Sequence, residues 1–243
     1  DVATGVAAGF VLSQDRLMTV RFAPSRVFDH YTQTLIEGAP RHGAPAHILV
    51  GLLEAIVDRQ ADTLEQMRTD CEMISHAIFA MGTKRSTGRK NEDAKLRRTL
   101  GELGRLGDMS SHVRETLVGA ARIVPYMEST AADWLPKDLP IRLATLRQDV
   151  NSLSDFGTHL SDKQQFLLDA TLGFISIAQN NVMKVMAIAS VVGIPPVLIA
   201  GVYGMNFKDI PELNWAWGYP YAWAVIIISA LIPTAMFRWW KWI

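Results

Sequence analysis

The sequence has only one cysteine and no net charge, and charged residues are scarce near its C-terminus. Among 243 residues, 24 basic side chains balance 24 acidic ones. Nucleic-acid-binding proteins usually carry a basic excess, so this balance argues against that class. The lone Cys71 cannot form an internal disulfide, which argues against a secreted fold held by disulfides. The 49% content of hydrophobic residues excludes disorder as the main state of the chain.

The chain also lacks the common patterns of catalytic and nucleotide-binding sites. No Gly-Lys-Ser/Thr phosphate-binding pattern occurs, so nucleotide-driven pumping finds no support. No pair of nucleophile and base is visible. Cys71 and His76 have no second pair of ligands, so we interpret them as a core cysteine and a surface histidine rather than a zinc site. We therefore predict that the protein is not an enzyme and has no resident cofactor, nucleotide or nucleic-acid partner.

Two long segments near the C-terminus contain no charged residue. They are residues 185–203 and residues 219–237. As a helix, each would extend about 28 Å, which is close to the hydrocarbon thickness of a bilayer. Tyrosine and tryptophan residues flank both segments, as they do at membrane interfaces. The pattern predicts a lipid-bilayer protein with two membrane helices, at about 183–203 and 219–238, rather than buried helices of a soluble core.

The positive charges around these segments predict their orientation. Lys184 precedes the first segment and Arg238 follows the second, while the loop 204–218 carries more acidic than basic residues. Basic residues favour the cytoplasmic side of a membrane. We therefore predict a multi-pass protein of the cell inner (plasma) membrane with both termini, including the tail 239–243, in the cytoplasm.

The residues before the first membrane segment predict a small sheet followed by helices. Phe10–Leu12 and Leu17–Phe22 have the pattern of a hairpin with a turn at Ser13–Arg16. We interpret residues 1–40 as the remnant of a cytoplasmic α/β domain. The chain begins at Asp1 rather than Met and shows no secretory signal, so we expect it to be a fragment whose other strands precede it.

The middle of the chain has the apolar spacing of helices. Residues 41–136 predict an antiparallel helical pair, with one helix at about 44–81 and the other ending near 127. Residues 137–203 contain no proline between Ile141 and Pro195, which predicts a stalk helix of about 95 Å that runs into the first membrane helix. So long a helix needs partners along its length, and these would be other copies of the chain. We expect a mainly α membrane protein.

One face of the predicted stalk helix carries residues suited to an aqueous path. These residues recur every seven positions along the helix or lie beside that row at spacings of three and four. They are Asp155, Asp162, Asp169, Ser176, Asn180, Met183, Met186, Ser190, Ile194, Val197, Gly201 and Gly204. A straight helix drifts about 20° per heptad, so this seam requires supercoiled or tilted helices. Asp169 lies among leucines near the bilayer, where an isolated charge is costly, and a ring of Asp169 around an aqueous axis would hold cations. For Asp155 and Asp162, simple exposure to water is the alternative.

The end of the first membrane segment carries motifs of a known family. Tyr203-Gly204-Met205-Asn206-Phe207 is followed by Ile210-Pro211-Glu212-Leu213 and by Gly218-Tyr219-Pro220. These closely resemble the CorA magnesium channels, whose signature is Gly-Met-Asn at the end of the first of two membrane helices. The resemblance reaches at least from Leu167 to Ile243.

The resemblance implies a homopentamer in which the first membrane helix lines one central pore for Mg²⁺, and for Co²⁺ or Ni²⁺ as the family often allows. The selectivity filter would consist of Gly204, Met205 and Asn206, with Asn206 as the outer ring and Gly204 supplying carbonyls. Met183, Met186 and Ile194 would be apolar constrictions, and Asn180 and Asp169 would line the inner vestibule. Together with the seam, the predicted pore lining and gate are Asp169, Asn180, Met183, Met186, Ser190, Ile194, Val197 and Gly201.

The chemistry of Mg²⁺ agrees with this assignment. Mg²⁺ dehydrates reluctantly, so neutral Asn206 carboxamides can contact its water shell without trapping the ion. Asp209 and Glu212 in the outer loop would raise the local cation concentration. The resemblance also implies regulatory Mg²⁺ between subunits, for which Asp149 and Asp155 are candidate ligands.

The chain departs from the family pattern at several positions, and two alternatives stay open. Val197 stands where the family often has Thr, Ile210 replaces a Met, and the C-terminal basic cluster is sparse. A zinc transporter of the same superfamily is one alternative, although those relatives tend to have Val where this chain has Met205. A non-conducting, membrane-anchored helical scaffold is the other, although it would have no use for Asn206 at a pore mouth.

Overall fold

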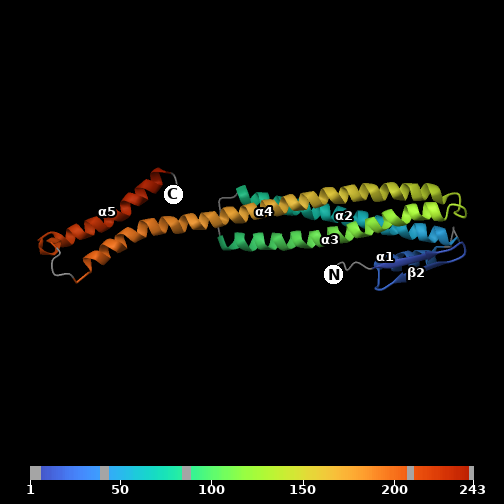
Figure 1. Cartoon of the computed structure of the whole chain (residues 1–243), viewed down its shortest axis with the longest axis horizontal. Coiled ribbons are helices and arrows are strands. Elements are labelled where there is room, and N and C mark those ends of the chain that lie inside the picture. Colours follow the sequence, from blue (N-terminus) through green and yellow to red (C-terminus); the bar gives the residue numbers. More distant parts are fainter. Residues whose placement is uncertain (1–6, 39–43, 84–88, 207–210, 241–243) are drawn as a thin grey trace. The chain divides into compact units, whose positions relative to one another are not determined.

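A computed structural model describes residues 7–38, 44–83, 89–206 and 211–240. The elements in chain order are β1 (Ala8–Leu12), β2 (Leu17–Arg21), α1 (Arg26–Glu37), α2 (Pro45–Thr83), α3 (Arg89–Thr130), α4 (Leu139–Tyr203), the 3₁₀ helix η1 (Pro211–Asn214) and α5 (Gly218–Trp239) (Figure 1). The chain divides into two compact units, Asp1–Leu172 and Gly173–Ile243. The mainly helical fold with one small sheet is confirmed.

The two strands form an antiparallel hairpin whose register runs from Ala8↔Arg21 to Leu12↔Leu17. Its turn is closed by Ser13, whose backbone N–H donates to the Arg16 carbonyl at 2.9 Å and whose Oγ accepts from the Arg16 N–H at 3.1 Å. Phe10 of β1 stacks on Phe28 of α1 with ring centroids 6.2 Å apart. The hairpin therefore packs on α1 through an aromatic pair, and the strands lie where the sequence predicts them.

Three helices pack side by side in the first unit: α2, α3 and the N-terminal part of α4 (Figure 1). Their directions follow from two ion pairs. Arg142 in the first turns of α4 binds Glu54 in the N-terminal part of α2, so these two helices run parallel. Arg147 of α4 binds Glu128 near the C-terminal end of α3 at 3.0 Å, so α3 runs antiparallel to both.

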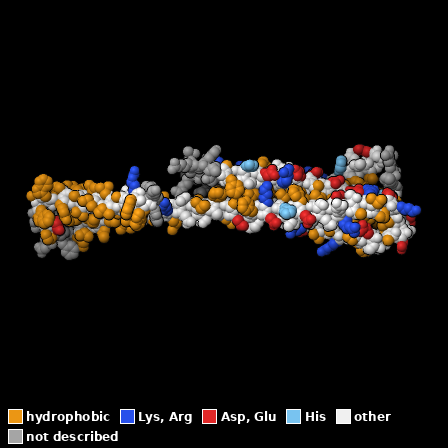
Figure 2. Space-filling view, turned by 90° about the horizontal axis from the view of Figure 1, so that it is seen from above, with side chains coloured by type: hydrophobic (Ala, Val, Ile, Leu, Met, Phe, Trp, Pro, Cys, Tyr) orange, Lys and Arg blue, Asp and Glu red, His pale blue; other side chains and the backbone are white. Residues whose placement is uncertain are grey.

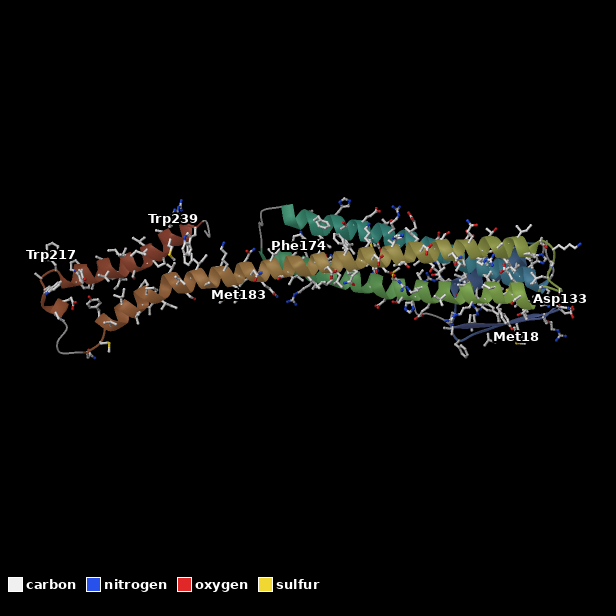
Figure 3. All side chains as sticks on the ribbon, turned by 45° about the horizontal axis from the view of Figure 1, so that its top comes forward. Met18, Asp133, Phe174, Met183, Trp217 and Trp239 are labelled. Carbon is white, nitrogen blue, oxygen red and sulfur yellow. The ribbon has the colours of Figure 1, made fainter. Side chains whose placement is uncertain are left out.

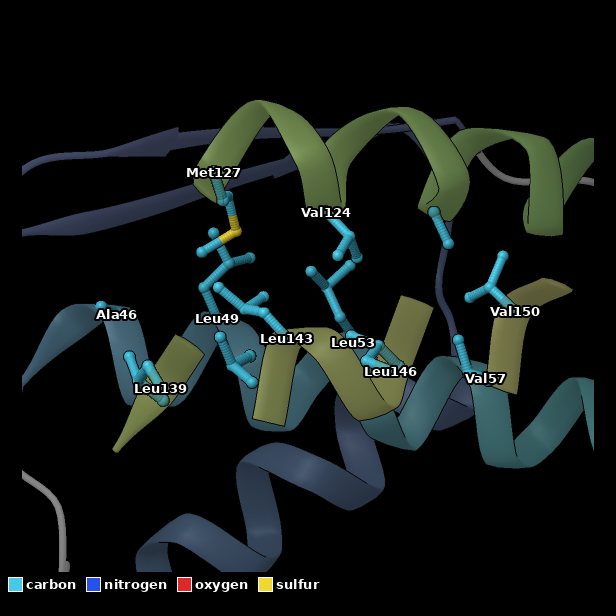
Figure 4. Packing of buried hydrophobic residues seen from close by; sticks show 12 residues of the cluster. Ala46, Leu49, Leu53, Val57, Val124, Met127, Leu139, Leu143, Leu146 and Val150 are labelled. Carbon is cyan, nitrogen blue, oxygen red and sulfur yellow. The ribbon is translucent and has the colours of Figure 1, made fainter. Parts of the chain in front are cut away.

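The core of this bundle consists of aliphatic side chains from all three helices (Figure 4). Its members recur at spacings of three and four residues, which places them on one face of each helix. They are Ala46, Leu49, Val50, Leu53, Val57, Ala120, Val124, Met127, Leu139, Leu143, Leu146 and Val150. Replacing one of the large members with Ala would cost about 2–5 kcal/mol of stability, so this core holds the three helices together.

A polar cluster links α1, α2 and α4 at the edge of this core. Arg142 donates from Nε to Glu54 Oε1 at 3.0 Å and from Nη2 to the other carboxylate oxygen, which makes the pair bidentate. The hydrogen bonds to Glu54 raise the pKa of the Arg142 guanidinium. Burial raises the pKa of the nearby Tyr31 hydroxyl. Both shifts favour the forms that these groups already have at physiological pH, a charged Arg142 and a neutral Tyr31.

Gly51 of α2 lies where Tyr31 of α1 approaches most closely. A Cβ atom on Gly51 would overlap the Tyr31 hydroxyl and would lie 3.1 Å from its Cζ. We expect Gly51→Ala to lower the free energy of unfolding by about 1–3 kcal/mol, because overpacking outweighs the better helix propensity of alanine. Urea unfolding of the detergent-purified protein, followed by circular dichroism, measures the change.

The double variant Gly51→Ala/Tyr31→Phe serves as the control for that prediction, because it removes the oxygen that the new Cβ would meet. It should recover part of the lost stability relative to Gly51→Ala alone. A Gly51→Ala variant as stable as the parent would show that Tyr31 does not resist displacement at this position and would contradict the expected overpacking.

Cys71 lies inside the same bundle. Its side chain is fully buried, and burial raises the pKa of its thiol, while His76 is exposed. The predicted core cysteine and surface histidine are therefore confirmed. Among the described residues, no group of three or more His, Cys, Asp and Glu side chains could hold a metal ion.

The second unit contains the C-terminal part of α4, η1 and α5. Both long helices are apolar and long enough to cross a membrane. In the most apolar window of α4, 0% of the residues are buried, and in that of α5 only 6% are. Figure 2 shows hydrophobic side chains covering the surface of this part of the molecule. A soluble core helix would be enclosed by other side chains, so this exposure favours two membrane helices.

Candidate functional site

The Gly-Met-Asn motif directly follows α4. The Gly204 N–H donates to the Ala200 carbonyl at 2.9 Å, and the Met205 N–H donates to the Val202 carbonyl at 3.2 Å. These bonds extend the last helical turn by two residues, and the exposed Asn206 comes next. Gly204 does not adopt the left-handed conformation, but a Cβ on it would lie 3.1 Å from the Ala200 carbonyl oxygen. The predicted filter therefore lies at the end of a membrane helix, with Asn206 free to meet a ligand.

The loop beyond this motif is folded against the start of α5. The Trp215 N–H donates to the Glu212 carbonyl at 3.3 Å, and the Gly218 N–H donates to the Trp215 carbonyl at 3.1 Å. The Trp215 and Tyr221 rings lie 5.9 Å apart, centroid to centroid. Glu212, the predicted cation-attracting residue, is half-buried, whereas Asp209 lies outside the described residues. The described loop is thus a short ordered turn that carries one carboxylate.

Gly218 has a role in this turn that sequence reasoning missed. A Cβ on Gly218 would overlap the backbone carbonyl oxygen of Glu212, so only glycine fits this approach. The sequence offers one signal, a glycine between an aromatic residue and the first turn of a membrane helix. That signal does not reveal which backbone atom lies opposite, because the approach depends on the fold of the loop.

The predicted pore-lining residues lie on one side of the C-terminal part of α4. At 3.6 residues per turn, the predicted pore-lining residues fall within an arc of about 120°. All are exposed: Asn180, Met183, Met186, Ser190, Ile194, Val197 and Gly201. The opposite side holds half-buried residues, among them Ile188, Val192 and Ile199, and also exposed ones, among them Asn181, Val185 and Val202. The predicted pore-lining residues are thus accessible in the single chain, but exposure does not distinguish their side of the helix from the others.

Two consecutive prolines interrupt the hydrogen bonding of α4 inside its membrane segment. Pro195 and Pro196 have no N–H, so the carbonyls of Val191 and Val192 lose their helical donors. Prolines in a helix also bend it, and α4 bends within its orange part (Figure 1). The two carbonyls without helical donors belong to residues within three positions of Ile194, which is one of the predicted constrictions.

The four acidic residues predicted along the stalk, Asp149, Asp155, Asp162 and Asp169, lie in the first unit and are exposed. The Asp169 carboxylate accepts a hydrogen bond from Gln165 Nε2 at 3.1 Å, one helical turn away. Asp149 and Asp155 also face away from the core of the unit. Within the described residues of one chain, neither gathers with two further ligands. Their assignment to a regulatory metal site stays a prediction.

Comparison with known proteins identifies the family. The model of the family described as CorA-like Mg²⁺ transporter protein matches residues 2–239. The chain belongs to this family. Its relatives include a protein of Yersinia pseudotuberculosis named Magnesium transport protein CorA, to which it is 31% identical over 248 residues. The alignment covers 100% of this chain and 73% of that relative.

Other members of the CorA-like family agree with this assignment. The Escherichia coli K12 protein of the same name is 30% identical over 243 residues, which cover 100% of this chain and 73% of the relative. The solved structure of the CorA magnesium transporter from Methanocaldococcus jannaschii superimposes with a TM-score of 0.72 at 17% identity, covering 98% of this chain and 76% of that one. At 17% sequence identity, this superposition shows that the two proteins share a fold and nothing more. A family of membrane transporters and two membrane-length helices together make this a membrane protein.

Proposed function

We propose that the protein is a passive Mg²⁺ channel that works as a homopentamer, with α4 lining one central pore. The observation that carries the proposal is the position of Gly204-Met205-Asn206, which directly follows the membrane-length apolar part of α4 and is exposed there. Relatives at 30–31% identity are named magnesium transport proteins. Five copies of the proposed pore-lining face around an axis would enclose water and leave the opposite face toward lipid and α5.

The ring of five Asn206 side chains is the proposed selectivity filter. A carboxamide is neutral, so it can accept hydrogen bonds from the water shell of Mg²⁺ without holding the ion too tightly for release. Gly204 would contribute carbonyl oxygens and Met205 an apolar wall beside the ring. Glu212, and Asp209 with it, would concentrate cations in front of this entrance.

Below the filter, the proposed pore alternates between polar and apolar rings. Met183, Met186 and Ile194 would close the path by dewetting, because a hydrated dication cannot pass a dry apolar ring. Ser190, Val197 and Gly201 would line the path between these constrictions. Asn180 and Asp169 would receive the ion in the inner vestibule. Co²⁺ or Ni²⁺, as hydrated dications of similar charge, would compete for the same rings.

The proposed transport is downhill and regulated by its own substrate. With both termini in the cytoplasm and the protein in the inner membrane, the membrane potential drives cations inward, at about 2.3 kcal/mol per charge for each 100 mV. Mg²⁺ bound near Asp149 and Asp155 of neighbouring subunits would favour the closed pentamer. High intracellular Mg²⁺ would then limit its own entry.

Uptake into liposomes tests this proposal. We expect the purified protein to admit Mg²⁺ along an inward-negative potential without nucleotide, as measured with an entrapped Mg²⁺-sensitive dye, and native mass spectrometry should show five subunits. A parallel assay with Zn²⁺ should give slower entry, because Met205 differs from the Val that zinc transporters tend to carry. Absence of uptake would favour the scaffold alternative, and a stable dimer would contradict a central pore.

A further inference from the structure

Glu212 is the only acidic side chain among the described residues of the second unit. It lies in η1, six residues after Asn206 in the chain. Glu212 and Tyr221 both lie within electrostatic range of the hydroxyl of Tyr203, the last residue of α4. Salt screens a carboxylate within about 8–10 Å, so its effect on a cation at the end of α4 depends on where η1 holds it.

The backbone of η1 alone holds this carboxylate weakly. The element has only four residues, Pro211–Asn214, and its first residue has no N–H to donate. The Trp215 N–H reaches the Glu212 carbonyl at 3.3 Å, which is long for a hydrogen bond of this type. Helical turns this short are marginal without packing against other elements. A contact from outside the turn is therefore needed to keep η1 in place.

The rings of Trp215 and Tyr221 make such a contact. Their centroids lie 5.9 Å apart and their planes are tilted by 58°, a geometry that aromatic pairs favour. Tyr221 belongs to the first turn of α5, where its N–H donates to the Trp217 carbonyl at 3.0 Å. Figure 3 shows Trp217 at this end of α5 and Trp239 at the other end. The pair thus joins a regular helix to the turn that carries Glu212.

Simple anchoring of both rings at the membrane surface is the alternative explanation. Trp215 is 56% exposed and Tyr221 is 46% exposed, as expected for side chains at a bilayer interface. The same explanation would apply to Trp223, which is 51% exposed on the same helix and has no ring contact with a described residue. Because only Tyr221 contacts the turn, Trp223 is a matched control.

We propose that Tyr221 is a positioning residue of the channel, whose ring holds Trp215 and thereby keeps the Glu212 carboxylate beside the pore entrance. This inference rests on the proposed function, in which Glu212 concentrates Mg²⁺ in front of Asn206. Loss of the Tyr221 ring would release η1 and spread the carboxylate over a larger volume, which lowers the local Mg²⁺ concentration. The Mg²⁺ concentration for half-maximal uptake would then rise, while the maximal rate, which depends on the pore, would not change.

Liposome uptake over a range of Mg²⁺ concentrations tests the effect on the entrance. We expect Tyr221→Ala to raise the half-maximal concentration about two- to fivefold, because the energy of an aromatic pair shifts an equilibrium by roughly two- to tenfold. Tyr221→Phe keeps the ring and should retain the parental value, and so should Trp223→Ala. In a Glu212→Gln background, Tyr221→Ala should cause no further change, since the charge that it positions is absent.

Cleavage after Glu212 by a glutamate-specific protease tests the positioning without ion conduction. A protease needs a segment that can leave its folded position. In the detergent-purified protein, Tyr221→Ala should therefore accelerate this cleavage by at least about threefold, given the same two- to tenfold shift in the docking of η1. Tyr221→Phe and Trp223→Ala should be cleaved at the parental rate. Mass spectrometry of the fragments measures the cut at this position.

Four results would overturn the proposal. These are unchanged cleavage in Tyr221→Ala, an unchanged half-maximal Mg²⁺ concentration in that variant, an equal shift in Trp223→Ala, and additive effects of Tyr221→Ala and Glu212→Gln. A lower maximal rate alone would likewise contradict it, because the defect would then lie in the pore. A parent protein that admits no Mg²⁺ would instead contradict the proposed channel, and the cleavage rates would still decide whether Tyr221 holds η1.

Discussion

Asn206→Ala is expected to lower Mg²⁺ uptake into liposomes by at least about tenfold. The carboxamides of the proposed ring would accept hydrogen bonds from the ion's water shell, each with a net value of about 0.5–1.5 kcal/mol, and alanine cannot replace them. Asn206 is exposed just beyond the end of α4, so its truncation should leave the helix and the subunit number unchanged. Dye-reported uptake and native mass spectrometry measure the two quantities.

Asn181→Ala is a matched control for this substitution. Asn181 is also exposed on α4, but it lies on the side of the helix opposite to the proposed pore lining. Its truncation removes the same carboxamide and should leave uptake at the parental rate. Unchanged uptake by Asn206→Ala would refute the filter assignment, and equal losses in both variants would indicate that a carboxamide is not specifically needed at the helix end.

Gly218→Ala is expected to lower both stability and uptake. The added Cβ would overlap the Glu212 carbonyl oxygen, and a backbone atom cannot move aside as a flexible side chain can. Overpacking of this kind costs about 1–3 kcal/mol, and opening the turn would move Glu212 away from the proposed pore entrance. Thermal unfolding in detergent and liposome uptake measure the two effects, and we expect uptake to fall several-fold.

Gly173→Ala provides the comparison for that prediction. A Cβ on Gly173 would meet no atom within 4 Å in the single chain, so alanine should be tolerated and could add up to about 1 kcal/mol through its helix propensity. If Gly218→Ala behaves like Gly173→Ala, then η1 and α5 do not approach each other as closely as the structure shows.

The elements that could be predicted are those that depend on one continuous stretch of sequence. The uncharged residues 185–203 and 219–237 predicted the membrane helices, and α4 and α5 cover both stretches. The turn at Ser13–Arg16 predicted the hairpin, because a turn depends on a few adjacent residues. The helix predicted at about 44–81 is α2, with bounds within two residues, and the helix predicted to end near 127 is α3, which ends at Thr130; such small differences are expected because helix ends depend on packing as well as on local sequence.

The contacts that hold the first unit together could not be predicted in the same way. Glu54 and Arg142 are separated by 88 residues, and nothing near either residue specifies the other. Tyr31 similarly meets Gly51 only because α1 packs on α2. Such pairs depend on how helices dock, and helical spacing alone leaves the docking partner open.

The sequence by itself determined that this is a two-span membrane protein of the CorA-like family, because span length and the Gly204-Met205-Asn206 signature are local and chemically specific. Only the tertiary structure decided which glycine must stay a glycine and which side chains of the first unit pack together. The physical reason is that the approach of Gly218 to the Glu212 carbonyl depends on how the loop folds, and burial depends on side chains from distant parts of the chain, so neither can be read from a local residue pattern.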